Sequence, residues 1–93
     1  MVKGVLNVFV ILVYDIHVKR VTKVLKKCRE YLNWVQNSVF EGEISEGNFK
    51  KLSMELEKII RDEDSVIIYH LRTTRYYSRE IIGKERSVLG NIL

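Results

Sequence analysis

The stretch GVLNVFVILVYDI, residues 4–16, decides the fold of this chain. Apart from Asn7 it is apolar from Val5 to Tyr14, and a carboxylate, Asp15, follows abruptly. A short apolar run rich in β-branched residues predicts a strand buried on both faces. A carboxylate at the end of such a strand can reach a ligand while the strand holds its backbone still. The alternative, which this stretch alone favours, is that Asp15 only caps the next helix, since aspartate is a common N-cap.

Composition indicates a single folded domain in a reducing compartment. The chain has 93 residues, of which 46% are hydrophobic and 30% are charged, which is typical of a small globular domain. The single cysteine, Cys28, excludes an internal disulfide and a cysteine-based zinc site, so we expect a cytoplasmic protein. No stretch reaches the ~20 apolar residues of a membrane span, so no membrane partner is expected. The net charge of +4 permits a polyanionic partner without requiring one.

Residues 17–32 predict an amphipathic helix with a basic face. Apolar residues recur at helical spacing on one side: Val21, Val24, Leu25, Cys28 and Leu32. The other side carries six cations: Lys19, Arg20, Lys23, Lys26, Lys27 and Arg29. Only Glu30 balances them, so a phosphate-binding face is about as well supported as a solvated one.

The rest of the chain predicts two more strands, a second helix and a last strand. Residues 33–44 alternate with a period of two, which favours a strand at 34–36, a bend at Asn37 and Ser38 and a strand to Glu43; one long bent strand is the alternative. Ser45 is a suitable N-cap for a helix with an apolar stripe at Phe49, Leu52, Leu56, Ile59 and Ile60. Residues 65–71, SVIIYHL, form the last predicted strand.

The order strand, helix, strand, strand, helix, strand predicts an α+β, ferredoxin-like βαββαβ sandwich with both helices on one face of an antiparallel sheet. Two helices cover only one sheet face, yet the first and last strands are apolar on both sides. A soluble monomer does not tolerate so large an exposed apolar patch, so we expect a homodimer with its sheets face to face. Residues 1–71 would form the core, and residues 72–93 a C-terminal dimerisation segment that adds a strand to the partner's sheet edge.

Four features together resemble the CRISPR-associated protein Cas2 family over residues 4–71. They are the first strand ending in Y-D-I, the basic helix, the run V-Q-N-S-V-F-E-G at 35–42 and the closing S-V-I-I-Y-H-L. The resemblance implies a homodimer that bridges the CRISPR-associated integrase during spacer acquisition, with duplex prespacer DNA lying across it. It also implies a metal-dependent endonuclease acting on single-stranded RNA or double-stranded DNA.

Carried over residue by residue, the resemblance makes Asp15 the catalytic residue and the ligand of a Mg²⁺ ion shared across the dimer. Its supporting residues are Tyr14, Ser38 and Phe40. The helix-opening basic residue is Arg20. The charges of the chain, doubled by the dimer, predict the other nucleic-acid contacts, and the full set is Lys19, Arg20, Lys23, Lys26, Lys27 and Arg72, with Arg75 and Arg79 as an extension. The chain departs from many relatives in having Trp34 where they have arginine, and in a short loop after Asp15 that lacks further acids.

Several residues have competing interpretations. Phe40 is more readily a core residue than a base-stacking platform, and Asp15 could be purely structural in a non-catalytic scaffold that binds nucleic acid and a partner protein. Glu41 and Glu43 share a strand face and are interpreted as a solvated face or as contacts to a partner protein, in preference to a second acidic site. The remaining candidates are a solvated His17, a packed or hydrogen-bonded His70, and an interface role for Tyr76 and Tyr77.

Overall fold

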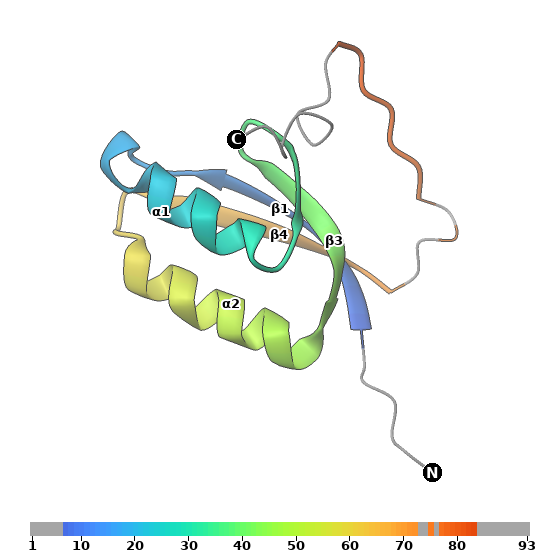
Figure 1. The fold of residues 1–93 in the computed structure, drawn as a ribbon, viewed down its shortest axis with the longest axis horizontal. Helices are drawn as coiled ribbons and strands as arrows, with labels where there is room; N and C mark the ends of the chain where they lie inside the picture. The colour runs from blue at the N-terminus through green and yellow to red at the C-terminus, as the bar shows by residue number, and fades with distance from the viewer. Residues whose placement is uncertain (1–6, 73–74, 76, 84–93) are drawn as a thin grey trace.

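Six elements follow one another as strand, helix, strand, strand, helix and strand in the computed structural model, which describes residues 7–72, 75 and 77–83 (Figure 1). They are β1 (Asn7–Asp15), α1 (Val18–Arg29), β2 (Asn33–Gln36), β3 (Val39–Ser45), α2 (Glu46–Ile59) and β4 (Ser65–Leu71). The strands form an antiparallel sheet in the order β2-β3-β1-β4, with β1 in the centre. Both helices lie side by side on one face of this sheet (Figure 1). The predicted ferredoxin-like α+β fold is confirmed.

The central strand buries only one of its faces within the chain. Val10, Leu12 and Tyr14 point toward the helices and are at most 6% exposed. The alternate residues point to the opposite face and are only partly covered. Burial on both faces was therefore not reached within one chain, because two helices cover one side of a sheet only.

The second sheet face is apolar and largely open, and we call it the open face. Its residues come from β1 and β4, and the strand register places them side by side: Phe9, Ile11, Val13, Ile67 and Tyr69. Ile67 is 50% exposed and Tyr69 is 56% exposed. The two strands alternate as the sequence predicted, and their outer residues meet water in the single chain.

The predicted apolar stripes of the two helices meet in the core. Val24 and Cys28 of α1 are fully buried, as is Leu52 of α2, and Leu56 is 3% exposed. Burial raises the pKa of the Cys28 thiol to about 12, so this residue is a neutral packing group. The packing interpretation of Cys28 is confirmed.

The N-cap of α1 is His17, not Asp15. The His17 Nδ1 atom accepts a hydrogen bond from the Lys19 backbone N–H at 3.1 Å. Asp15 instead ends β1, opposite Ser65 of β4, and its side chain is exposed. The interpretation of Asp15 as a helix cap is wrong, because the strand continues to this residue and two further residues separate it from the helix.

The middle of the chain forms two strands joined by a tight turn. Asn37 has a φ of 40°, a left-handed conformation that asparagine adopts more readily than most residues. The Trp34 Nε1–H donates to the Asn37 carbonyl at 2.9 Å and closes this turn. Ser45 caps α2 by accepting from the Asn48 N–H at 3.1 Å. The hairpin and the cap are confirmed, and the single bent strand is wrong.

A C-terminal segment contacts the open face of its own chain. The Tyr77 hydroxyl donates to Glu41 Oε1 at 2.6 Å, and Arg79 donates to Glu41 Oε2 from Nε at 2.9 Å. The Tyr77 ring also lies 5.2 Å from the ring of Phe9. Glu41 is only 9% exposed, so its interpretation as part of a solvated face is wrong, whereas Glu43 is exposed.

The division of the chain at residue 71 stays a prediction. Most of the proposed dimerisation segment, including Tyr76, lies outside the described residues. The residues concerned are 73–74, 76 and 84–93. Among the helices that the structure describes, none is long and apolar enough to cross a membrane.

Candidate functional site

The site is built at the end of β1, where Asp15 lies on the same face as the apolar residues of the open face. Side chains two apart in a strand share a face, so Asp15 follows Phe9, Ile11 and Val13 on the side away from the helices. The register continues this order, since Val13 is paired with Ile67 and Asp15 with Ser65. The exposed carboxylate therefore stands at one end of the open face.

Two of the predicted supporting residues point into the core. Tyr14 is 6% exposed and Phe40 is fully buried, with their rings 6.2 Å apart. Burial raises the pKa of the Tyr14 hydroxyl above its ordinary value of 10.0. Buried in this way, Phe40 has no face free for stacking on a base, and its interpretation as a core residue is confirmed.

Ser38 is joined to Tyr14 through the backbone. The Tyr14 N–H donates to the Ser38 carbonyl at 3.0 Å, which ties the β2–β3 turn to the end of β1. The structure thus brings the Tyr14–Asp15 end of β1 and the turn at Ser38 to one end of the sheet.

A buried carboxylate that the sequence analysis did not single out lies next to this site. The Asp64 side chain is fully buried and accepts from Arg20 Nε at 2.6 Å and from Arg20 Nη2 at 3.1 Å. It also accepts from the backbone N–H of His17 and of Arg61, each at 2.9 Å. We call this arrangement the Asp64 brace. It joins the loop after Asp15, the first turn of α1 and the turn before β4.

The brace accounts for Arg20. This guanidinium binds Asp64 and also Glu63, whose Oε2 lies 3.0 Å from Nη2. Arg20 holds the pKa of the Asp64 carboxyl far below its ordinary range, and the two backbone N–H groups act in the same direction. Arg20 is therefore committed to two carboxylates of its own chain. The signal in the sequence was the acidic run 62–64, directly before the strand that pairs with Asp15.

The ionised Asp64 predicts a defined pH dependence of stability. Because its pKa is depressed in the folded chain, its stabilisation is present above the ordinary pKa of 3.8 and is lost as the pH falls below that value. The substitution Asp64→Asn should lower the melting temperature at pH 7 by roughly 5–10 °C. Thermal melts between pH 7 and pH 2 should show this difference constant to about pH 5 and shrinking below about pH 4. A difference that stays constant to pH 2 would contradict the role of the charge.

The basic face of α1 is reduced to three exposed lysines. Lys27 pairs with Glu30 at 3.2 Å and with Glu55 of α2 at 2.8 Å, and these bonds raise its pKa. The exposed lysines follow one another at spacings of four and three residues, which places them on one side of the helix: Lys19, Lys23 and Lys26. The solvated and the phosphate-binding interpretations both apply to this smaller set.

Trp34 is engaged within the chain. The Arg29 guanidinium lies 5.7 Å from the centre of its ring, a cation–π contact, and its indole N–H closes the β2–β3 turn.

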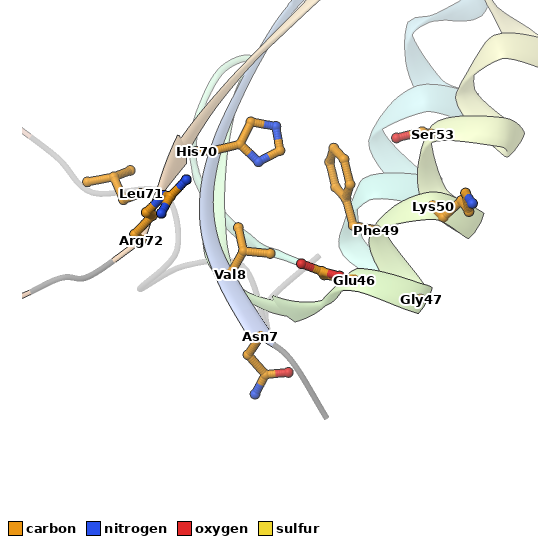
Figure 2. A pocket seen from close by; sticks show the side chains of 10 residues that line it. All are labelled: Asn7, Val8, Glu46, Gly47, Phe49, Lys50, Ser53, His70, Leu71 and Arg72. Carbon is orange, nitrogen blue, oxygen red and sulfur yellow. The ribbon is translucent and has the colours of Figure 1, made fainter. Parts of the chain in front are cut away.

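Arg72 lies at the other end of the sheet, in a separate cavity of about 790 Å³ (Figure 2). The cavity is formed by the start of β1, the end of β4 and the first turns of α2. Figure 2 shows Phe49 and His70 pointing toward one another there, and their rings meet edge to face at 5.1 Å. The eight steps of β1 from Asn7 to Asp15 separate this cavity from the candidate site by about 26 Å. Arg72 therefore does not extend the site around Asp15.

The donor chemistry at Asp15 suits a hard cation, and Asp15 is the one carboxylate that β1 supplies. Among the residues that the structure describes, no three His, Cys, Asp or Glu side chains gather as a metal site. Mg²⁺ prefers oxygen ligands and keeps several waters, so one or two protein carboxylates suffice. The buried Asp64 carboxylate is held by its own donors, whereas Asp15 is exposed at the end of β1.

Comparisons with known proteins agree with this architecture. The sequence model of the family described as CRISPR associated protein Cas2 matches residues 8–79. The CRISPR-associated endoribonuclease Cas2 of Dictyoglomus turgidum is 51% identical over 86 residues, which cover 91% of this chain and 99% of the relative. The protein of the same name from Methanothermobacter thermautotrophicus is 48% identical over 90 residues, covering 96% of this chain and 99% of the relative.

Solved structures show the same fold. A crystal structure of Cas2 superposes with a TM-score of 0.80 at 41% identity and covers 87% of this chain and 92% of that one. Streptococcus pyogenes Cas2 superposes with a TM-score of 0.68 at 30% identity, covering 78% of this chain and 98% of that one. With the family match extending over most of the described residues and close relatives matched over nearly their whole length, this chain belongs to the CRISPR-associated protein Cas2 family.

Proposed function

We propose that this protein is a homodimeric CRISPR-associated endonuclease and adaptation protein that cleaves single-stranded RNA in a Mg²⁺-dependent reaction at Asp15. The observation that carries the proposal is the position of Asp15 at the end of the open face, beside Val13 and Ile67. The curated relatives bear the name of an endoribonuclease, which supports the reaction class.

The open face supports the dimer. It presents Ile67 and Tyr69 half exposed, next to the partly covered residues of β1. A second copy offers the same surface, and a two-fold axis lets each subunit bury the other's apolar face. Because Asp15 belongs to that face, closing two copies together would bring the two carboxylates toward the seam. Two like charges brought together favour the uptake of a cation.

The residues of the chain then have separate tasks. Asp15 supplies carboxylate oxygens to the ion, which when bound would stabilise charge on the scissile phosphate and activate a water. The lysines of α1 attract the phosphate backbone of the substrate, and the Asp64 brace holds the loop that follows Asp15. Contacts to the backbone alone predict little sequence preference.

We further propose that the dimer binds duplex DNA along its doubled α1 lysines and bridges the CRISPR-associated integrase. The support is membership of the Cas2 family together with the exposed row Lys19, Lys23 and Lys26. A second candidate function is a non-catalytic scaffold that binds the same partners. The observation favouring it is that, among the residues that the structure describes, no three His, Cys, Asp or Glu side chains of one chain gather as a metal site.

The dimer is tested by placing a charge on the open face. The substitution Ile67→Lys should convert the dimer into a monomer, because a lysine cannot be buried unpaired between two apolar sheets. The matched control is Met54→Lys, since Met54 of α2 is also a large apolar residue and is 54% exposed. Sedimentation velocity at micromolar concentration should give a dimer for wild type and the control. A wild-type monomer would contradict the dimer and the shared ion.

The reaction is tested with wild-type protein on single-stranded RNA. Cleavage should occur in Mg²⁺ and stop in excess EDTA, and Ile67→Lys should lose it together with the dimer. Cleavage that is unaffected by EDTA would contradict the metal dependence, and full activity of an Ile67→Lys monomer would contradict the shared site.

A further inference from the structure

We propose that Asp64 is a positioning residue for Asp15, acting through Arg20 and the His17 backbone. The inference deepens the proposed nuclease function and rests on it. It assigns a role to the one fully buried carboxylate of the Asp64 brace, which lies next to the site without being exposed to a substrate.

The bonds of Asp64 divide between its two oxygens. Oδ1 accepts from the His17 N–H at 2.9 Å and from Arg20 Nη2 at 3.1 Å. Oδ2 accepts from Arg20 Nε at 2.6 Å and from the Arg61 N–H at 2.9 Å. Both oxygens are thus held by charge-assisted and backbone donors at once, which makes the carboxylate a rigid junction.

The junction fixes the backbone of Asp15 from two directions. Asp15 is paired with Ser65 in the β1–β4 ladder, and Asp64 is the residue directly before Ser65. His17, which donates to Asp64, lies two residues after Asp15. Asp15 is therefore held on both sides. Its own strand pairing joins it to Ser65, and the hydrogen bond from His17 to the Asp64 side chain fixes the backbone that follows it.

Such a closure matters for a carboxylate that must meet its symmetry mate. Productive geometry at a reacting site is held to within about 0.5 Å, and a displacement of about 1 Å costs up to about a hundredfold in rate. Without Asp64 the segment 16–17 keeps its helix cap but loses its tie to β4. The Asp15 carboxylate would then sample several positions, which lowers the rate of the reaction more than the affinity for RNA.

The chain offers two matched controls. Glu63 contacts the same Arg20, but its side chain is 63% exposed. Glu55 of α2 forms a 2.8 Å ion pair with Lys27 and so joins α2 to α1. Lys27 lies two helical turns after Arg20 in α1. Glu63 and Glu55 each form an ion pair with a basic residue of α1. The hydrogen bond from the His17 N–H goes to Asp64 instead.

The experiment compares Asp64→Asn, Glu63→Gln and Glu55→Gln in the full chain, at a temperature at which circular dichroism shows all of them folded. Cleavage of single-stranded RNA should show kcat about tenfold lower for Asp64→Asn with KM within about twofold of wild type. Both glutamine variants should keep both constants within about twofold. A loss that is only structural would reduce the folded fraction and leave kcat per folded molecule unchanged.

A second readout does not depend on turnover. Mn²⁺, titrated with detection by electron paramagnetic resonance, should bind Asp64→Asn several-fold more weakly than wild type and bind the two glutamine variants normally. Arg20→Lys, which keeps the charge but loses the two-pronged bond, should fall between Asp64→Asn and wild type and serves if Asp64→Asn does not fold.

The outcomes separate this inference from the proposed function. If folded Asp64→Asn keeps the kcat and the Mn²⁺ binding of wild type, the positioning role is overturned. The same holds for Arg20→Lys if Asp64→Asn does not fold. An inactive Asp15→Ala would still support the nuclease in either case. A wild-type protein that neither cleaves RNA nor binds Mn²⁺ would overturn both.

Discussion

Asp15→Ala is expected to reduce cleavage of single-stranded RNA by on the order of 10²- to 10³-fold, the usual cost of removing a group dedicated to charge stabilisation. The carboxylate is exposed at the end of β1, so its loss removes the ligand while leaving the fold in place. The melting temperature should stay within about 3 °C of wild type, since surface substitutions change stability little. Cleavage in Mg²⁺ and in EDTA, measured on wild type and variant purified in parallel, checks both statements.

The matched control is Asp62→Ala, which removes an exposed carboxylate from the turn before β4. It should keep the activity of wild type, whereas the cleavage that remains in Asp15→Ala sets the upper limit on any contaminating nuclease common to the preparations. Equal cleavage by wild type and Asp15→Ala would remove the catalytic role. Unchanged binding of the integrase by Asp15→Ala would then favour the non-catalytic scaffold.

The second large effect is expected for DNA binding by the α1 lysines. Replacing Lys19, Lys23 and Lys26 together by glutamine removes six charges from a dimer. Each phosphate neutralised on duplex DNA contributes about −0.9 to the slope of log affinity against log salt, so the slope should become shallower by up to about 5. Affinity at low salt should fall by roughly a hundredfold or more. Fluorescence anisotropy with labelled duplex DNA at several salt concentrations measures both.

A triple variant of α2 separates local contact from overall charge. Lys50, Lys51 and Lys58 are exposed on α2, and their replacement by glutamine changes the net charge by the same amount. This variant should keep most of the slope, because its lysines belong to the other helix. An equal loss in the two triple variants would contradict a DNA-binding face on α1 and would indicate a general effect of charge.

The structure also changes the meaning of several cations and acids that look alike in the sequence. Arg20 and Lys27 belong to the same basic run as Lys23, yet they are bound to Asp64 and Glu55. Glu41 and Glu43 occupy equivalent positions two apart in β3, yet Glu41 is covered by Tyr77 and Arg79. Residue type and spacing did not distinguish the members of either set.

The sequence by itself determined the elements and the faces of this protein. The apolar run at residues 65–71 predicted β4 to the residue, and the apolar spacing of α2 with Ser45 as its cap predicted the second helix. It also placed Asp15 at the end of the first strand, although that stretch alone favoured a helix cap there. These features depend on neighbours within a few positions along the chain, whose periodicity reports directly which side of an element is buried.

Only the tertiary structure decided which charged side chains are already paired within the chain and which sheet face stays open. Arg20 and Asp64 are 44 residues apart, and Tyr77 and Glu41 are 36 apart, so no local pattern links them. Their pairing depends on how α1, the turn before β4 and the C-terminal segment pack around the sheet. Likewise, β1 is apolar on both sides in the sequence, and only the placement of both helices on one face leaves Asp15 at the edge of an uncovered apolar surface.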